Sequence, residues 1–363
     1  MTNAADYAAD QIRAFSVDLE RFSAELRTKA LEFLLSLEEE LVRLLQRYDF
    51  EAVSRSDAKA ARLAKLLEQT RAIIATVYGQ VWVEMKTNLA HVAELAATNA
   101  AAAINGAVLA TIATVALPPE RIRALVDGTL IQGAPSKQWW SDQAATTLKN
   151  FTNEVQKGYA SGEGAAEIAR RIRGTEANGY KDGVMDISRR NAEALVRSSV
   201  QAVSNSARTE TFENNDDIVE NLMQISTLDG RTTVICMARS GKMWNTKTKE
   251  PVGHSIPWNG GSPHHWQCRS VEVAVLKPLN KLPSRKKSAV ENAGTQSSMD
   301  GQVPADMDYQ DWLRTKPEAF QKEALGEGKW QLWKDGKITL SQMLDMRGNP
   351  MTLAELRRRY GGK

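Results

Sequence analysis

The residue types that could carry chemistry gather in one glycine-rich stretch of this 363-residue chain. Cys236 and Cys268 are its two cysteines, and His254, His264 and His265 are three of its four histidines. Thiolate sulfur and imidazole nitrogen are ligands that zinc prefers, and the His-x-x-Cys spacing of His265 and Cys268 sets two of them close together. With Cys236 as a third ligand, a tetrahedral zinc site would need either His254 or His264 as its fourth.

A disulfide and plain packing are two other interpretations of the cysteines. A bond between Cys236 and Cys268 would close the loop, but the N-terminal sequence lacks the basic start and apolar core of a secretion signal. We therefore expect a reducing cytosol, which disfavours disulfides. Two buried thiols beside hydrogen-bonded histidines would need neither a metal nor a cross-link. Zinc, a disulfide and packing all stay open, and no cofactor is required.

Catalysis is not expected from this sequence. It contains no His-Glu-x-x-His, no Gly-x-Ser-x-Gly, no Walker-type glycine loop and no dinucleotide-binding glycine motif. A zinc ion with four protein ligands would also leave no coordination position for an attacking water. Asp229, near the Cys/His residues in sequence, keeps a metal-dependent nuclease as the third choice of function.

The overall charge does not by itself indicate nucleic-acid binding. The chain has 47 Lys and Arg against 44 Asp and Glu, a formal charge of +3. Local basic clusters are the candidates for contact with DNA. They comprise Arg170, Arg171, Arg189, Arg190, Arg285, Lys286 and Lys287. The uncharged segment 100–117 is alanine-rich and interrupted by polar residues, so no membrane association is expected.

The elements that would position these residues are mostly helices. No proline precedes Pro118 and no glycine precedes Gly79, so the common helix breakers are missing from a very long stretch. Apolar residues recur there at steps of three and four, which predicts long antiparallel helices with one buried face. Residues 1–117 are thus expected to form a long helical arm or bundle.

The rest of the chain is predicted to form several different kinds of structure. Glycine-punctuated short helices are expected over 118–217, and a small β-containing Cys/His module over 218–276, where 270–276 alternates apolar and polar residues. A polar linker over 277–306 precedes a C-terminal helical subdomain over 307–363. The predicted fold is therefore mainly α, with a small α+β, loop-rich module and a short helical C-terminal piece.

The motifs within this module resemble those of a known family. Residues 228–232 read Leu-Asp-Gly-Arg-Thr, and 263–270 read Pro-His-His-Trp-Gln-Cys-Arg-Ser. Together they resemble the signature of tailed-phage minor head proteins, the head-morphogenesis proteins of the SPP1 gp7 and Mu F type. Residues 161–168 and 192–198 look like the helical part of the same domain, so the resemblance covers about 119–276.

One departure from the family pattern concerns metal binding. Many members have Asp-x-Arg-Thr-Cys-x-x-Cys, whereas this chain has Thr233 where the first of those cysteines would stand. The full set of three cysteines and one histidine is therefore incomplete here, and zinc is an option that the resemblance leaves open.

The resemblance implies a structural role in procapsid assembly. A minor head protein of this type would bind at the portal vertex or the inner capsid surface, in the virion head and earlier in the host cytoplasm. The expected partners are the portal protein and the major capsid or scaffolding protein, with phage DNA as a further contact and no small-molecule substrate. The N-terminal helices would be the docking arm. A DNA-binding role in genome packaging or ejection is the alternative function. The residues expected to shape the motif as a scaffold are Asp229, Arg231, Cys236, His265, Cys268 and Arg269.

Overall fold

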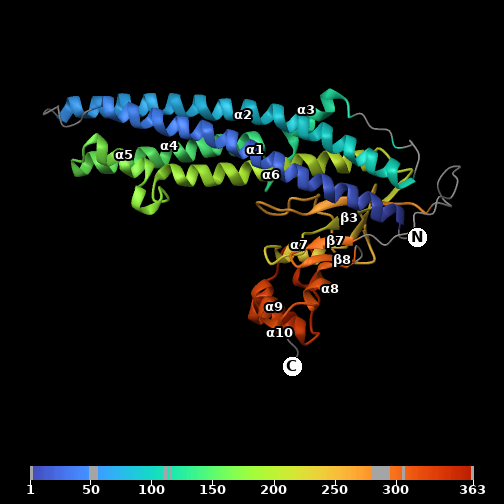
Figure 1. Ribbon diagram of the computed structural model, residues 1–363. Coiled ribbons are helices and arrows are strands. Elements are labelled where there is room, and N and C mark those ends of the chain that lie inside the picture. The colour runs from blue at the N-terminus through green and yellow to red at the C-terminus, as the bar shows by residue number, and fades with distance from the viewer. Residues whose placement is uncertain are drawn as a thin grey trace. The chain divides into compact units, whose positions relative to one another are not determined.

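The computed structural model describes residues 3–48, 56–108, 113, 117–278, 295–304 and 307–360 (Figure 1). The fold is mainly α, as predicted, with long N-terminal helices, a small sheet-containing module and short C-terminal helices. The chain divides into two compact units, each assembled from separate stretches. Unit 1 comprises Met1–Leu19, Val92–Leu125 and Gln201–Lys363, and unit 2 comprises Glu20–His91 and Val126–Val200. The domains predicted from the sequence are continuous stretches of chain, unlike these units, and their boundaries stay a prediction.

The two predicted N-terminal helices are α1 (Asn3–Arg47) and α2 (Ser56–Val108). Three contacts of α1, or of the residue after it, with α2 lie in unit 2: Tyr48 with Gln69, Lys29 with Glu84, and Phe22 with His91. Residue numbers fall on α1 as they rise on α2, so the helices are antiparallel, as the sequence predicted. Their apolar stripes are buried at helical spacing, with Leu26, Leu34, Leu37, Leu41, Leu66, Val81 and Met85 almost fully enclosed.

Unit 2 is completed by shorter helices and a small hairpin. These elements are β1 (Leu130–Ile131), β2 (Ala134–Pro135), α4 (Ser136–Ser161), α5 (Ala165–Arg173), the 3-10 turn η1 (Glu176–Asn178) and the first part of α6 (Val184–Glu213). A buried hydroxyl chain ties three of its helices together: Tyr78 of α2 bonds Thr147 of α4, which bonds Ser188 of α6. Each hydroxyl thus finds a partner away from water.

Unit 1 contains a four-stranded antiparallel sheet. Its strands are β3 (Val219–Ile225), β4 (Met243–Asn245), β5 (Pro251–Val252) and β6 (Val271–Leu276), in the order β5-β4-β3-β6. The short helix α7 (Val234–Arg239) lies between β3 and β4 in sequence, and α3 (Pro119–Gly128) also belongs largely to this unit. One core of unit 1 joins Phe212, β3 and β6 to apolar residues of α1 and α2.

A second core of unit 1 combines the sheet module with the C-terminal residues. The C-terminal elements are β7 (Thr295–Ser298), β8 (Gly301–Pro304), α8 (Tyr309–Arg314), α9 (Glu318–Leu325), α10 (Glu327–Lys334), η3 (Ser341–Met343) and α11 (Leu353–Tyr360). Trp312 and Leu340 share this core with Leu228, Met237 and Trp244 of the module. Within the predicted linker, β7 and β8 form a hairpin, whereas 279–294 lie outside the described residues.

The membrane question has a direct structural answer for this part of the chain. Among the described residues, none of the helices combines the length and the apolar character that a bilayer crossing requires.

Two helical glycines allow a matched test of packing in unit 2. A methyl group on Gly158 of α4 would lie 2.4 Å from buried Ile168 of α5, whereas one on Gly79 of α2 would meet nothing within 4 Å. We expect Gly158→Ala to lower the free energy of unfolding by about 1–3 kcal/mol because of overpacking. Gly79→Ala should raise it by about 0.5–1 kcal/mol through helix propensity. Urea titration followed by circular dichroism measures both, and equal effects would contradict this packing.

Candidate Cys/His site

The structure brings Cys236, His265 and Cys268 together. Cys236 lies in the first turn of α7, and the other two lie on the loop that precedes β6. The Cys236 sulfur is 3.6 Å from the Cys268 sulfur and 3.3 Å from Nε2 of His265. Both cysteines are free and buried, and His265 is half-buried. The disulfide interpretation is therefore not what this structure contains.

The spacing of these donor atoms fits a zinc ion. Bonds of about 2.3 Å to sulfur and about 2.0 Å to nitrogen in a tetrahedron place two sulfurs about 3.8 Å apart and a sulfur and nitrogen about 3.6 Å apart. All three ligand atoms lie within 4.8 Å of one another. The donor set is thus suitable for zinc, with three of the four ligands that a closed structural site would have.

Neither histidine predicted as the fourth ligand joins the group. Nε2 of His254 donates to the Met243 carbonyl at 2.8 Å, and its Nδ1 accepts from the Ile256 amide. Nε2 of His264 lies 2.8 Å from Oε1 of Gln224, and burial lowers the pKa of His264 to about 4. Both imidazoles are engaged elsewhere in the module, so the predicted four-residue set is not assembled.

The two cysteines have different proton affinities in this pair. The hydrogen bond to Cys268, together with burial, raises the pKa of the Cys236 thiol. The same bond, and the neighbouring His265, lower the pKa of Cys268. Burial disfavours the charged form of His265, but the Cys268 sulfur outweighs it and raises the pKa of this imidazole. The group therefore favours one thiolate, held between a thiol and an imidazole.

The predicted acidic and basic motif residues form the main link across the module. Two guanidinium nitrogens of Arg269 donate to the two carboxylate oxygens of Asp229 at 2.6 and 2.7 Å. Asp229 also accepts from the Arg231 amide, and Tyr309 donates to its carbonyl oxygen. The side chain of Arg231 is 82% exposed and 3.8 Å from the carboxylate. Arg269, and not Arg231, is thus the partner that joins the two motif segments.

Sequence reasoning missed a buried polar network behind the Cys/His loop. Arg239 of α7 is 1% exposed and donates to Gln224 and to the carbonyls of Pro257 and Trp258. Glu272 of β6 accepts from the amide and hydroxyl of Ser262, and burial raises its pKa. The alternation over 270–276 predicted a strand, and that strand, β6, is covered on both faces, so its polar residue Glu272 is buried. The position of Arg239 directly after the apolar run 234–238 was the available signal for this network.

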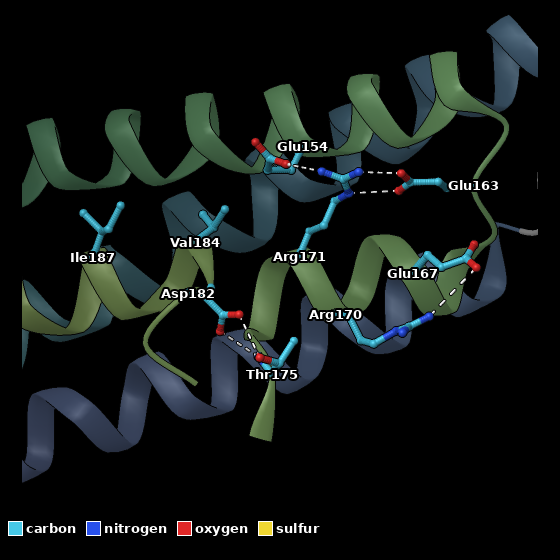
Figure 2. A pocket seen from close by; sticks show the side chains of 10 residues that line it. Glu154, Glu163, Glu167, Arg170, Arg171, Thr175, Asp182, Val184 and Ile187 are labelled. Carbon is cyan, nitrogen blue, oxygen red and sulfur yellow. Dashed lines mark hydrogen bonds and ion pairs between the residues drawn. The ribbon is translucent and has the colours of Figure 1, made fainter. Parts of the chain in front are cut away.

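The arginines predicted to contact DNA are paired with carboxylates in unit 2. Figure 2 shows Arg171 of α5 between Glu163 and Glu154, with its Nε 2.9 Å from Glu163. Arg170 lies 3.9 Å from Glu167. These residues line an open pocket of about 640 Å³ whose apolar part is Val184 and Ile187.

Two further arginines that were predicted to contact DNA also have carboxylate partners. Arg189 pairs with Glu38, which also binds Arg173, and Arg190 pairs with Asp186 at 2.8 Å. Arg285, Lys286 and Lys287 lie outside the described residues. The four described arginines are therefore parts of ion pairs and do not form a free basic face.

The comparison with known protein families agrees with the resemblance seen in the motifs of this module. Residues 149–273 match the family model described as phage Mu protein F like protein. No curated protein and no solved structure matches the chain. The matched range begins in α4, ends in β6 and contains both motif segments.

The match over 149–273 supports a head morphogenesis protein of the phage Mu F type. This similarity of residues 149–273 to the phage Mu F family confirms the resemblance drawn from the motifs.

The ion pair between Asp229 and Arg269 can be tested against a built-in control. We expect a double-mutant cycle with Asp229→Ala and Arg269→Ala to give a coupling energy of about 1.5–3 kcal/mol, because both hydrogen bonds are charge-assisted. Arg231→Ala, at the exposed neighbour of the same carboxylate, should change the free energy of unfolding by less than about 0.5 kcal/mol. Chemical denaturation measures all four variants. Similar losses for Arg231→Ala and Arg269→Ala would contradict the assignment.

The same pair should contribute to acid sensitivity. Burial opposes ionisation of Asp229, but Arg269 outweighs it, so the pKa of Asp229 lies below its ordinary value. A lowered folded-state pKa stabilises the fold above the unfolded pKa of about 3.9, and this stabilisation is lost as the pH falls through the folded-state pKa. Between pH 7 and pH 3, Asp229→Asn should therefore lose less stability than the wild type in urea titrations. A loss as steep as the wild type's would count against this pair.

Proposed function

We propose that this protein is a minor structural component of a tailed-phage head that acts in procapsid assembly at the portal vertex or the inner capsid surface. The family match over 149–273 carries the proposal, because the matched range contains the motif segments that Asp229 and Arg269 join. The membership in a head protein family implies a place in the virion, and assembly in the host cytoplasm would precede it.

The motif residues have a structural role in this proposal. The Asp229–Arg269 pair joins the turn after β3 to the segment before β6, and the donor atoms of Cys236, His265 and Cys268 lie together in the same module. The charges of Asp229 and Arg269 neutralise each other within the module, so the arrangement fixes the shape of a loop. A rigid surface of this kind suits a protein that must fit one position in a capsid. The metal-dependent nuclease stays the third choice.

The partners we propose are the portal protein and the major capsid or scaffolding protein. In unit 2, α1 and α2 each expose a large apolar side chain to solvent. Leu35 is 48% exposed and Val83 is 65% exposed. Exposed apolar positions on long helices are candidates for burial against a partner. We assign the docking arm to these helices.

DNA binding has less support than the structural role. Arg170, Arg171, Arg189 and Arg190 already have carboxylate partners, and separating these pairs would oppose the gain from phosphate contact. Within the described ranges, no arrangement of the predicted contacts favours DNA over a protein partner.

Co-sedimentation with the portal protein of the same phage tests the proposed function. We expect wild-type protein to sediment with portal assemblies, and Leu35→Glu combined with Val83→Glu to reduce the bound fraction at least about 10-fold, since two desolvated charges oppose docking. Met346→Glu, at an apolar side chain that is 83% exposed on the C-terminal part, is the matched control and should bind like the wild type.

Two results would contradict parts of the proposal. Absence of the protein from purified heads, together with no sedimentation with portal or capsid proteins, would defeat the structural role. Unchanged binding of the double variant at an unchanged melting temperature would remove the docking role of the helices while leaving the head assignment intact.

A further inference from the structure

The Cys/His group of this chain combines three protein ligands with space for a fourth, smaller one. A cavity of about 20 Å³ adjoins Cys236 and His265 and is bordered by the polar residues Arg231, Thr232 and Gln267. A polar cavity of this size accommodates about one water molecule. The space beside the donors is thus suited to a single solvent molecule.

The orientation of His265 matches that of a metal ligand. Its Nδ1 lies 2.9 Å from the carbonyl oxygen of Trp266, which can only accept a hydrogen bond. The proton of the neutral ring is therefore on Nδ1, and Nε2 presents a lone pair toward the sulfur of Cys236. A histidine held by a carbonyl through one nitrogen commonly binds zinc through the other.

Thr233 explains why the site has only three protein ligands. It is the residue before α7, and a side-chain hydrogen bond joins it to Cys236, so the two side chains lie next to each other. A neutral hydroxyl is a much weaker zinc ligand than a thiolate. A cysteine at this position would complete a closed site, whereas threonine leaves the fourth position to solvent.

We propose that this chain binds one zinc ion through Cys236, Cys268 and Nε2 of His265, and that a water molecule in the adjoining cavity is its exchangeable fourth ligand. A structural zinc site has four protein ligands, and a site with three retains an open position. The metal joins α7 to the loop before β6 while keeping one coordination bond accessible to solvent. This inference does not depend on the proposed function.

The test compares metal coordination in the full-length protein and in two variants of Thr233. Wild-type protein, loaded with Zn²⁺ and freed of excess metal, should contain one zinc per chain by elemental analysis. X-ray absorption should then give two sulfur ligands, one imidazole and one further oxygen. Thr233→Cys should give three sulfur ligands and no oxygen, and Thr233→Ser, the matched control, should give the wild-type set.

Two further measurements keep the result independent of folding defects. In the Co²⁺ forms, thiolate charge-transfer absorption should be stronger in Thr233→Cys than in the wild type and unchanged in Thr233→Ser. In chelator competition, Thr233→Cys should bind zinc at least about 10-fold more tightly than the wild type, and His265→Ala at least about 10-fold more weakly, since even the loss of an outer hydrogen-bond partner costs about 10- to 100-fold. Circular dichroism checks that each variant is folded.

Three outcomes would overturn the proposal. Folded wild-type protein that retains no zinc would show that the thiols only pack. If X-ray absorption gave two imidazole ligands in the wild type, a second histidine, and not water, would be the fourth ligand. An intact mass lower by two hydrogen atoms, restored by a reductant, would identify a disulfide in place of a metal site.

Discussion

The bidentate ion pair between Asp229 and Arg269 is the interaction on which the Cys/His module depends. It joins two segments far apart in sequence, and the donor atoms of Cys236, His265 and Cys268 meet only if those segments stay in register. Two parallel charge-assisted hydrogen bonds fix distance and direction together, which a single contact would not. Such a pair contributes geometry more than net stability, because its groups lose hydration on burial.

A second layer of contacts fixes the loop that carries His265 and Cys268. Arg239 holds the carbonyls of Pro257 and Trp258, and Glu272 holds the backbone of Ser262. Both charged side chains are buried, so each must bond the loop or remain unsatisfied at a substantial free-energy cost. The loop can therefore be rich in glycine and still have one conformation, because the sheet and α7 supply the constraints that it lacks.

Helix periodicity made α1, α2 and their antiparallel pairing predictable, since apolar spacing reports directly on burial. The meeting of Cys236 with His265 and Cys268 was also predictable from residue types. The exclusion of both His254 and His264 from the group was not predictable, because neighbours in sequence can face opposite ways: His264 contacts Gln224, while His265 contacts Cys236. Sequence gives the charge of an arginine cluster but not its partners, and for this reason the carboxylates beside Arg171 and Arg189 were missed.

The shared core of the sheet module and the C-terminal helices has a consequence for biosynthesis. Leu228, Met237 and Trp244 are enclosed by residues that follow position 306, including Trp312 and Leu340. During translation, the ribosome releases the module well before these covering residues emerge. The module therefore cannot complete this core until Trp312 and Leu340 have emerged, and until then its apolar surface remains open to wrong associations.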